Sequence, residues 1–227
     1  PAWFEQQHAN LSDTNAADAS SDADNDGLTA LQEYAANTDP NNADTAGLGL
    51  GDSLAHGLRS HIPLDGIGVD TVRGVRGIEQ EWYHGWPEYR PGVISGSLLL
   101  NGTARPHQSV EIPLDNSLRF GTSKDFTVSV WAKAPSAPSN DPAVISDKNW
   151  YYGHYKGWAI ATAPNGRWQW NIGDGTRRAD YDGPAGGLSD GNWHLLTVTH
   201  DRDGDAVLYY DGNEVARRNI SNITDIN

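Results

Sequence analysis

From residue 53 onward, apolar and polar residues alternate with a period of two over short stretches. The alternation is cleanest in Phe126–Ala132 and in Trp193–Thr199. A period of two is typical of a β-strand that buries one face and exposes the other. No long run with the helical period of 3.6 residues occurs in this part of the chain. The sequence therefore predicts a series of short strands.

Turn-forming residues separate these strands. In two places a short turn sequence lies between two alternating stretches: Ala163–Gly166 between Trp158–Ala161 and Arg167–Ile172, and Asp211–Asn213 between Val207–Tyr210 and Glu214–Arg217. Gly and Asn in such turns adopt the positive φ that tight hairpins need. Many short strands joined by turns of this kind predict an all-β sandwich.

The charge of the chain is concentrated at its N-terminal end. The formal net charge is −14, and residues 1–52 hold ten acidic residues and neither Lys nor Arg. The first basic residue is Arg59, and the remainder is close to balanced. We therefore expect two parts, residues 1–52 and residues 53–227. Because phosphate binding needs clustered Lys and Arg, nucleic acid is not expected as a partner.

A twelve-residue stretch of the acidic part follows the pattern D-x-D-x-D-G-x5-E. The residues at positions 1, 3, 5, 7 and 12 are, in that order, Asp22, Asp24, Asp26, Leu28 and Glu33. Alternate residues of a tight loop point inward, Leu28 offers its carbonyl, and Glu33 closes the site with both carboxylate oxygens. Several carboxylates held this close repel one another unless a cation neutralises them. The spacing therefore predicts a calcium site.

Two other acidic stretches fit this pattern less well. Asp201–Asp205 lacks the glycine at position 6 and the acid at position 12, and it is interpreted as a polar hairpin turn. Asp44–Gly49 keeps the frame of a loop but lacks acids at positions 3 and 5. A second calcium site, near Asp44 or in the β part, is left open.

The stretch Asp22–Leu28, together with Glu33–Tyr34 and Thr38–Thr45, resembles the thrombospondin type 3-like calcium repeats of bacteria. The resemblance covers about residues 1–52. It implies a calcium-stiffened extracellular spacer. We expect Trp3, Phe4 and Leu11 to cap this spacer or to dock it on the next domain.

Five stretches of the second part together resemble laminin G-like, concanavalin A-like lectin sandwiches: His61–Gly66, Ser97–Gly102, Phe126–Ala132, Asp190–His194 and Leu208–Gly212. The resemblance implies a two-sheet antiparallel jelly roll. Members of this family bind glycans, proteins or cell surfaces, often with calcium, and some relatives by fold are glycan hydrolases or lyases. The expected fold class is therefore mainly β, a jelly-roll sandwich preceded by a short calcium-binding loop-helix segment.

Aromatic residues in the first predicted hairpin and in the irregular stretch before it are candidates for ligand contact. The candidate residues are Trp150, Tyr155, Trp158, Trp168 and Trp170. Flat rings next to amide and carboxylate groups suit sugar rings, whose C–H faces stack while their hydroxyls form hydrogen bonds. The alternative is that these rings fill a cluster beneath a loop. Trp131 and Trp193 lie in the strongest strands and are expected in the core.

No catalytic constellation is evident in the sequence. Glycan hydrolases of this fold carry carboxylates on alternate residues of one strand, so that acid and nucleophile face the same cleft. Asp180 and Asp182 are the nearest pair, but the surrounding glycines favour a turn at this point. We expect the chain not to cleave polysaccharides.

Together these features predict a secreted, calcium-binding module that binds a glycan or a cell-surface component and has no catalysis of its own. One alternative is the N-terminal accessory part of a secreted polysaccharide-degrading or other extracellular hydrolytic enzyme. Another is a subunit of an extracellular filament. No run of 18 apolar residues occurs, so membrane insertion is not expected.

The end of the sequence raises one more expectation. The last hairpin ends near Asn219, and Ile220–Asn227 suffices for one short strand. In laminin G-like sandwiches further strands follow and pair with the first strand. We therefore expect Leu58–Leu64, the first strand, to lack part of its partner. The chain would then be a fragment of a longer one, or a neighbouring subunit would supply the strand.

Overall fold

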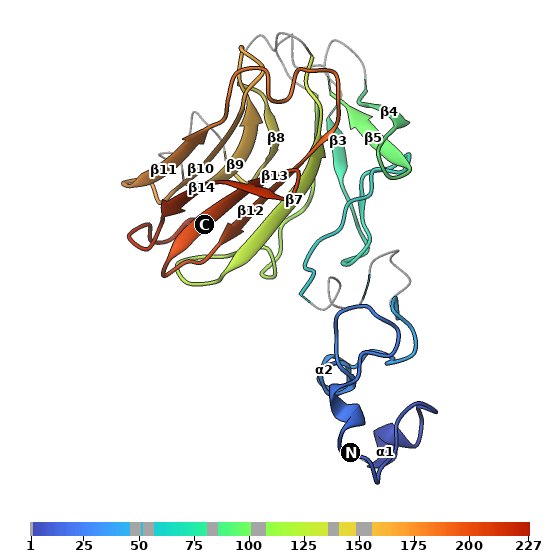
Figure 1. Cartoon of the computed structure of the whole chain (residues 1–227). Helices are drawn as coiled ribbons and strands as arrows, with labels where there is room; N and C mark the ends of the chain where they lie inside the picture. The colour runs from blue at the N-terminus through green and yellow to red at the C-terminus, as the bar shows by residue number, and fades with distance from the viewer. Residues whose placement is uncertain are drawn as a thin grey trace. The chain divides into compact units, whose positions relative to one another are not determined.

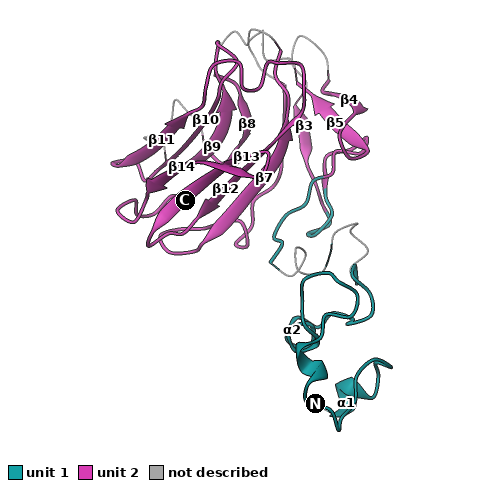
Figure 2. Ribbon diagram, viewed as in Figure 1, with its two compact units in different colours: residues 1–62, 70–74 teal, residues 63–69, 75–227 magenta. Residues whose placement is uncertain are grey.

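The computed structural model describes residues 2–45, 51, 57–80, 86–100, 108–135, 141–148 and 156–227. The chain divides into two compact units (Figure 2). The first comprises residues 1–62 and 70–74, and the second comprises residues 63–69 and 75–227. The acidic segment lies in the first unit and the predicted strands lie in the second. In the part of the chain that the structure describes, no helix is long and apolar enough to cross a membrane.

The first unit holds the helices α1 (Ala2–Glu5) and α2 (Ala30–Ala36) and the 3-10 turn η1 (Asp18–Ser20) (Figure 1). The side chain of Thr29 accepts a hydrogen bond from the backbone N–H of Gln32, and the Gln32 side chain accepts one from Thr29. This reciprocal capping box fixes where α2 begins. Asn37, with φ of 62°, ends the helix in the left-handed conformation.

Aromatic side chains near the N-terminus pack on α2. Phe4 is buried, and its ring centroid lies 5.3 Å from that of Tyr34. The ring centroid of Trp3 lies 5.9 Å from the same tyrosine. The ring centroid of His8 lies 4.5 Å from that of Phe4. Trp3 and Phe4 therefore cap the acidic segment, which is one of the two roles expected for them.

Two four-stranded antiparallel sheets form most of the second unit. One sheet has the order β14-β13-β12-β7 and the other has the order β11-β10-β9-β8. Their strands are β7 (Phe126–Ala132), β8 (Ala143–Ser146), β9 (Gly157–Thr162), β10 (Trp168–Gly173), β11 (Arg178–Asp182), β12 (His194–His200), β13 (Asp205–Tyr210) and β14 (Asn213–Asn219). Figure 1 shows the two sheets as separate layers. The predicted β fold and both predicted hairpins are confirmed.

Three two-stranded ladders precede the large sheets. They pair β1 (Val69–Asp70) with β2 (Val75–Arg76), β3 (Ile78–Gln80) with β6 (Ser109–Glu111), and β4 (Glu88–Pro91) with β5 (Gly96–Leu99). Leu58–Leu64 contains no strand, so the expected first strand is wrong. The carbonyl of His61 instead accepts a hydrogen bond from the backbone N–H of Thr71 at 2.8 Å.

The core lies between the two large sheets. β10 contributes Trp170 and Ile172, and the facing sheet contributes Leu196, Val198 and Leu208, all at most 1% exposed. Strand alternation places these side chains on the inner face of each sheet, since every second residue points the same way. The burial of such large apolar side chains provides most of the stability of a sandwich.

The segment after β14 packs into this core without forming a strand. Ile220, Ile223 and Ile226 are at most 2% exposed. Nη2 of Arg202, in the turn between β12 and β13, lies 3.1 Å from the carbonyl oxygen of Ile223 and 2.7 Å from that of Thr224. The same nitrogen lies within 3.4 Å of two carbonyl oxygens of the segment before β7, those of Gly121 and Thr122. Arg202 therefore fastens both segments to one turn.

Candidate metal centre and binding faces

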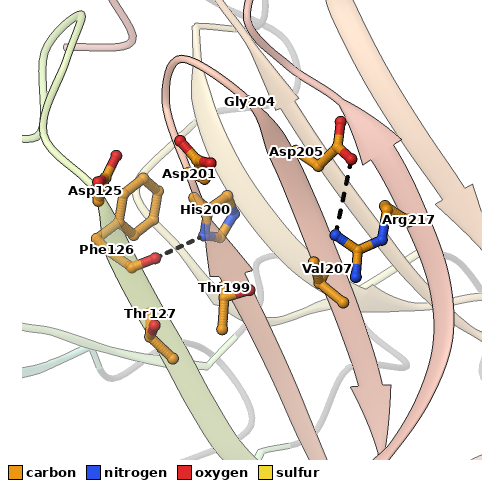
Figure 3. A pocket seen from close by; sticks show the side chains of 10 residues that line it. All are labelled: Asp125, Phe126, Thr127, Thr199, His200, Asp201, Gly204, Asp205, Val207 and Arg217. Atoms are coloured by element: carbon orange, nitrogen blue, oxygen red, sulfur yellow. Dashed lines mark hydrogen bonds and ion pairs between the residues drawn. The ribbon is translucent and has the colours of Figure 1, made fainter.

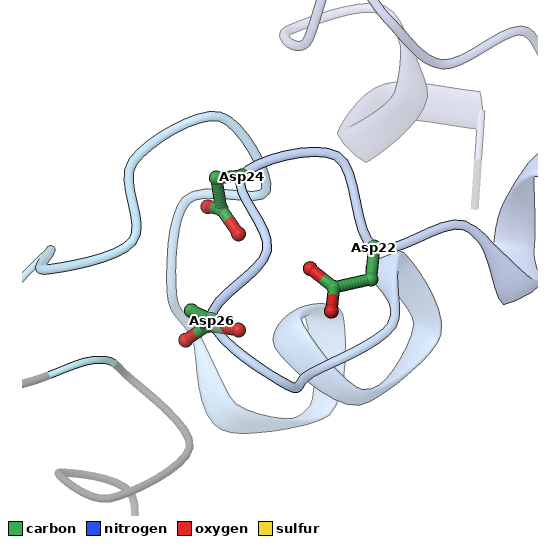
Figure 4. Close-up of side chains that lie close together, drawn as sticks. All are labelled: Asp22, Asp24 and Asp26. Carbon is green, nitrogen blue, oxygen red and sulfur yellow. The ribbon is translucent and has the colours of Figure 1, made fainter.

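The three aspartates of the acidic loop converge on one point (Figure 4). One carboxylate oxygen from each of Asp22, Asp24 and Asp26 can be chosen so that all three lie within 4.8 Å of one another. This is the only group of three or more potential metal ligands among the residues that the structure describes. The convergence agrees with the geometry that the spacing predicts.

Backbone conformation brings these carboxylates together. Asn25 and Gly27 have φ of 61° and 96°, which turns the chain sharply between the aspartates. The N–H of Gly27 donates to Oδ2 of Asp22 at 3.1 Å, and the N–H of Leu28 donates to Oδ1 of Asp26 at 2.7 Å. The turn therefore holds the first and third carboxylates in place.

The carboxylate of Asp24 lacks the hydrogen bonds that a buried charge normally has. Both of its oxygens are buried, and neither has a hydrogen-bond partner in the described part of the chain. Burial, together with the charges of Asp26 and Asp22, raises the pKa of Asp24 above its usual value. A buried carboxylate without a partner is costly. A bound cation would remove that cost.

The remaining proposed ligands lie at the end of the same loop. Glu33, in the first turn of α2, is fully buried, and Leu28 is 9% exposed. Carboxylate and carbonyl oxygens are the ligands that calcium prefers. The residues present therefore fit a calcium ion in donor chemistry. The second loop frame, which begins at Asp44, continues into residues 46–49, outside the described residues.

The tryptophans predicted to contact a ligand lie in the core. Trp158, Trp168 and Trp170 are 7%, 0% and 1% exposed. The expectation that their rings stack on sugars is therefore wrong, because they fill the space between the sheets. The other two candidates, Trp150 and Tyr155, lie outside the described residues.

Asp180 and Asp182 lie in strand β11 and not in a turn as expected. Both are exposed, and alternation places them on the same side of the strand. The guanidinium of Arg178 pairs with Asp180, while Asp182 accepts a hydrogen bond from the side-chain amide of Gln169 at 2.6 Å. Paired carboxylates thus do share a strand face. Each is engaged by a neighbouring side chain.

The outer face of the sheet β14-β13-β12-β7 carries a different set of side chains. Trp131 is 40% exposed there, so its expected place in the core is wrong. Its neighbours on β7, Ser129 and Thr127, point to the same side and lie opposite Thr197 and Thr199 of β12. The sequence did contain a signal for this orientation. Trp131 falls on the same face of the strand as polar Thr127 and Ser129, whereas Phe126 and Val128 fall on the other.

A pocket of about 450 Å³ lies at one end of this outer face (Figure 3). Its lining includes Thr127 of β7, Thr199 of β12, and Asp205 and Val207 of β13. Asp205 and Arg217 face each other across β13 and β14, with a carboxylate oxygen 3.8 Å from the guanidinium. Sequence reasoning missed this pocket because its residues come from four separate stretches.

A histidine held between two carboxylates fixes the other end of β12. Nδ1 of His194 lies 2.8 Å from Oδ2 of Asp211, and Nε2 lies 3.1 Å from Oδ1 of Asp190. The ring stacks on Tyr210 at 4.6 Å. Burial lowers the pKa of His194, but the hydrogen bonds to Asp211 and Asp190 outweigh it, so the pKa is raised. His194 therefore has a structural role.

Comparison with known proteins identifies the sandwich. Residues 101–227 match the family model Laminin_G_3, described as concanavalin A-like lectin/glucanases superfamily. Over 114 residues the chain is 31% identical to botulinum neurotoxin type E of Clostridium butyricum, and over 123 residues it is 23% identical to botulinum neurotoxin type X of Clostridium botulinum. These matches cover 45% and 52% of the chain. The chain spans only 9% of the length of each toxin.

Solved structures show the same fold. The binding domain of Paraclostridial Mosquitocidal Protein 1 matches 70% of this chain and 39% of its own length, with a TM-score of 0.57 and 20% identity. The binding domain of botulinum neurotoxin serotype G matches 70% of this chain and 38% of its own length, with a TM-score of 0.54 and 18% identity. Because the family model covers more than half of the chain, the chain belongs to the Laminin_G_3 family of the concanavalin A-like lectin/glucanases superfamily.

Proposed function

We propose that this chain is a secreted, calcium-binding module whose sandwich binds a glycan or another cell-surface component. The observation that carries the calcium part is the carboxylate of Asp24, which is buried without a hydrogen-bond partner among the described residues. The binding part is supported by the fold and by its relatives. Two of the structural neighbours with this fold are described as binding domains.

Calcium would be held by five groups of the acidic loop. The carboxylates of Asp22, Asp24 and Asp26, the carbonyl of Leu28 and the carboxylate of Glu33 would be its ligands. The ion supplies positive charge where three carboxylates meet. Without it their mutual repulsion opposes the turn that Asn25 and Gly27 make. The loop would then be stiff only when calcium is bound.

Isothermal titration calorimetry with calcium tests this part. Wild type should bind calcium with a Kd on the order of 10⁻⁴–10⁻³ M, typical of extracellular modules. Asp24→Asn and Glu33→Gln should each weaken binding by at least about tenfold. The matched control is Asp13→Asn, which removes an exposed acid of the same unit outside the loop. Equal affinities for wild type and Glu33→Gln would contradict the loop assignment.

An array of immobilised glycans and intact cells tests the binding part. Labelled wild-type chain should be retained by a defined subset of glycans or by cells, and treatment of the cells with glycosidases should reduce the retention. Repeating the measurement with a calcium chelator, on wild type and on Asp24→Asn, tests whether retention depends on the ion that the acidic loop would hold. Absence of binding to every glycan and every cell type would refute the proposal.

A further inference from the structure

We infer that the outer face of the sheet β14-β13-β12-β7 is the glycan site and that it takes an uncharged chain of sugar rings. This inference rests on the proposed function and assigns it a place and a ligand class. The face comprises the outward side chains of the four strands, from Trp131 at one end to the pocket lined by Thr127 and Asp205 at the other.

Four hydroxyl groups form the centre of this face. The strand register places Thr127 opposite Thr199 and Ser129 opposite Thr197. Oγ of Ser129 lies 2.9 Å from Oγ1 of Thr197, and no charged side chain lies between these two pairs in the register. A hydroxyl both donates and accepts hydrogen bonds, as the hydroxyls of a sugar do. The four hydroxyls can therefore form hydrogen bonds with the hydroxyls of a sugar ring, and each can act as donor or as acceptor.

Two aromatic rings lie beside the hydroxyls. Trp131 lies opposite Leu195 in the register and is 40% exposed, while Tyr209 lies opposite Thr197 and is half-buried. An exposed indole within a regular strand leaves apolar surface in water, which is a common mark of a binding surface. The C–H face of a sugar ring would cover it.

The length of the face fits an oligosaccharide. From Trp131 to Thr127 is four residues, or about 13 Å along an extended strand. This length accommodates about two or three linked sugar rings lying along β7 and β12. The pocket at the far end, with the Asp205–Arg217 pair, would then receive the last ring (Figure 3).

Charge favours a neutral ligand over an anionic one. Alternation and register place four carboxylates on this face, those of Asp125, Asp201, Asp205 and Glu214. The basic side chains on the same side are Arg217, which pairs with Asp205 and Glu214, and Lys133. A face with surplus negative charge repels sulfated or sialylated glycans.

The opposite side of the sandwich is a poorer candidate. The outward side chains of β9 and β10 include Ala159, Ala161 and Asn171, which are 0%, 0% and 2% exposed. A ligand cannot reach these residues without displacing other parts of the chain. Among the described residues, the accessible polar side chains on that side include Gln169, Asp180 and Asp182, which are hydrogen-bonded or ion-paired to neighbouring side chains at the β10–β11 edge, and Ser146 on β8.

Affinity electrophoresis in gels that contain a neutral polysaccharide tests the inference. We would use mixed-linkage β-glucan, galactomannan and arabinoxylan, with dextran sulfate as the anionic probe. Wild type should be retarded by at least one neutral polysaccharide and not by dextran sulfate. Trp131→Ala should weaken that binding about tenfold, equivalent to about 1.4 kcal/mol. Thr197→Val, which removes one hydroxyl at nearly constant shape, should weaken it several-fold.

Trp86→Ala is the matched control, since Trp86 is an exposed tryptophan of the same unit, at 56% against 40% for Trp131, and it lies outside this sheet. It should bind like wild type. If wild type binds a neutral glycan and both face variants bind it equally well, this site is wrong while the proposed function stands. Retention by dextran sulfate alone overturns the ligand class. Retention of folded wild type by none of these probes overturns the inference itself, and the array of glycans and cells then decides the proposed function separately.

Discussion

The indole N–H of Trp170 in β10 donates a hydrogen bond to Nε2 of His200 in β12, at 3.1 Å. The two residues belong to different sheets, so this polar contact crosses the core. On its other side, His200 directs Nδ1 to the carbonyl oxygen of Phe126 at 3.2 Å. Because Nε2 accepts, the proton of the neutral ring lies on Nδ1. Both ring nitrogens are satisfied when the histidine is uncharged.

Acid should therefore destabilise the sandwich through His200. Burial lowers the pKa of His200 to about 3. In the unfolded chain the pKa is about 6.5, so between these two pKa values the unfolded state binds a proton and the folded state does not. The contribution of neutral His200 to the free energy of unfolding is fully present above pH about 6.5 and is lost as the pH falls toward 3. Between pH about 7 and 5, His200 should account for about 2 kcal/mol of lost unfolding free energy.

Urea unfolding of wild type and His200→Gln at these two pH values measures this contribution. The glutamine can still accept from the indole of Trp170 but does not titrate. We expect the variant to be less stable at neutral pH and to lose about 2 kcal/mol less on acidification. An identical pH dependence in the two proteins would show that His200 does not stay neutral.

His194, six residues earlier in the same strand, should act with the opposite sign. Its pKa is raised, since the hydrogen bonds to Asp211 and Asp190 outweigh burial. Its stabilising contribution is therefore complete below pH about 6.5 and is lost as the pH rises through the folded-state pKa. Asp211→Asn keeps the Oδ1 acceptor for the N–H of Leu195 but removes the charge. The stability difference between wild type and this variant should be larger at pH about 6 than at about 8.5.

Removal of calcium should destabilise the first unit. At free calcium one hundred times Kd, binding adds about 2.7 kcal/mol to its unfolding free energy. In differential scanning calorimetry, the transition of the first unit, in which Trp3 packs on Tyr34, should shift to lower temperature on addition of a chelator. The same chelator should leave the unfolding of Asp24→Asn nearly unchanged. A shift of equal size in that variant would place the ion elsewhere.

The orientation of the tryptophans predicts two different mutational costs. Trp168→Ala removes a fully buried ring and should cost about 3–5 kcal/mol of stability. Trp131→Ala removes a ring from the solvent side of β7 and should cost less than about 1 kcal/mol. Chemical denaturation of the two variants distinguishes the core from the binding face. Comparable losses would mean that the outer face is packed against something.

The strands and turns of the sandwich could be predicted because their signals are local. The alternation in Phe126–Ala132 and the turn at Asp211–Asn213 each depend on neighbouring residues alone. The convergence of Asp22, Asp24 and Asp26 was predictable for the same reason, since a tight loop brings alternate residues together. Local periodicity thus sufficed for the elements and for the acidic loop.

Which face of a strand is buried does not follow from neighbouring residues alone, and here the predictions from the sequence were wrong. Trp168 and Trp170 alternate with Gln169 and Asn171, so one face is aromatic and the other is amide. Apolar burial selects the aromatic face for the core. In β7 the same rule exposes Trp131. Four apolar side chains, those of Phe126, Val128, Val130 and Ala132, share the opposite face of the strand, and burying all four is more favourable than burying one indole ring. Asp180 and Asp182 were misplaced because flanking glycines resemble a turn while pairing with β10 makes a strand.

The contacts of Arg202 have a consequence for how this sandwich opens. Its guanidinium reaches carbonyl oxygens at both Thr122 and Thr224, about a hundred residues apart in the chain. The side chain of Asn227 also accepts from the N–H of Gly121 at 3.2 Å. Neither segment can fray without releasing the other, so their amide protons should exchange with solvent in one concerted event. Hydrogen exchange would then report a single opening energy for two stretches that are remote in sequence.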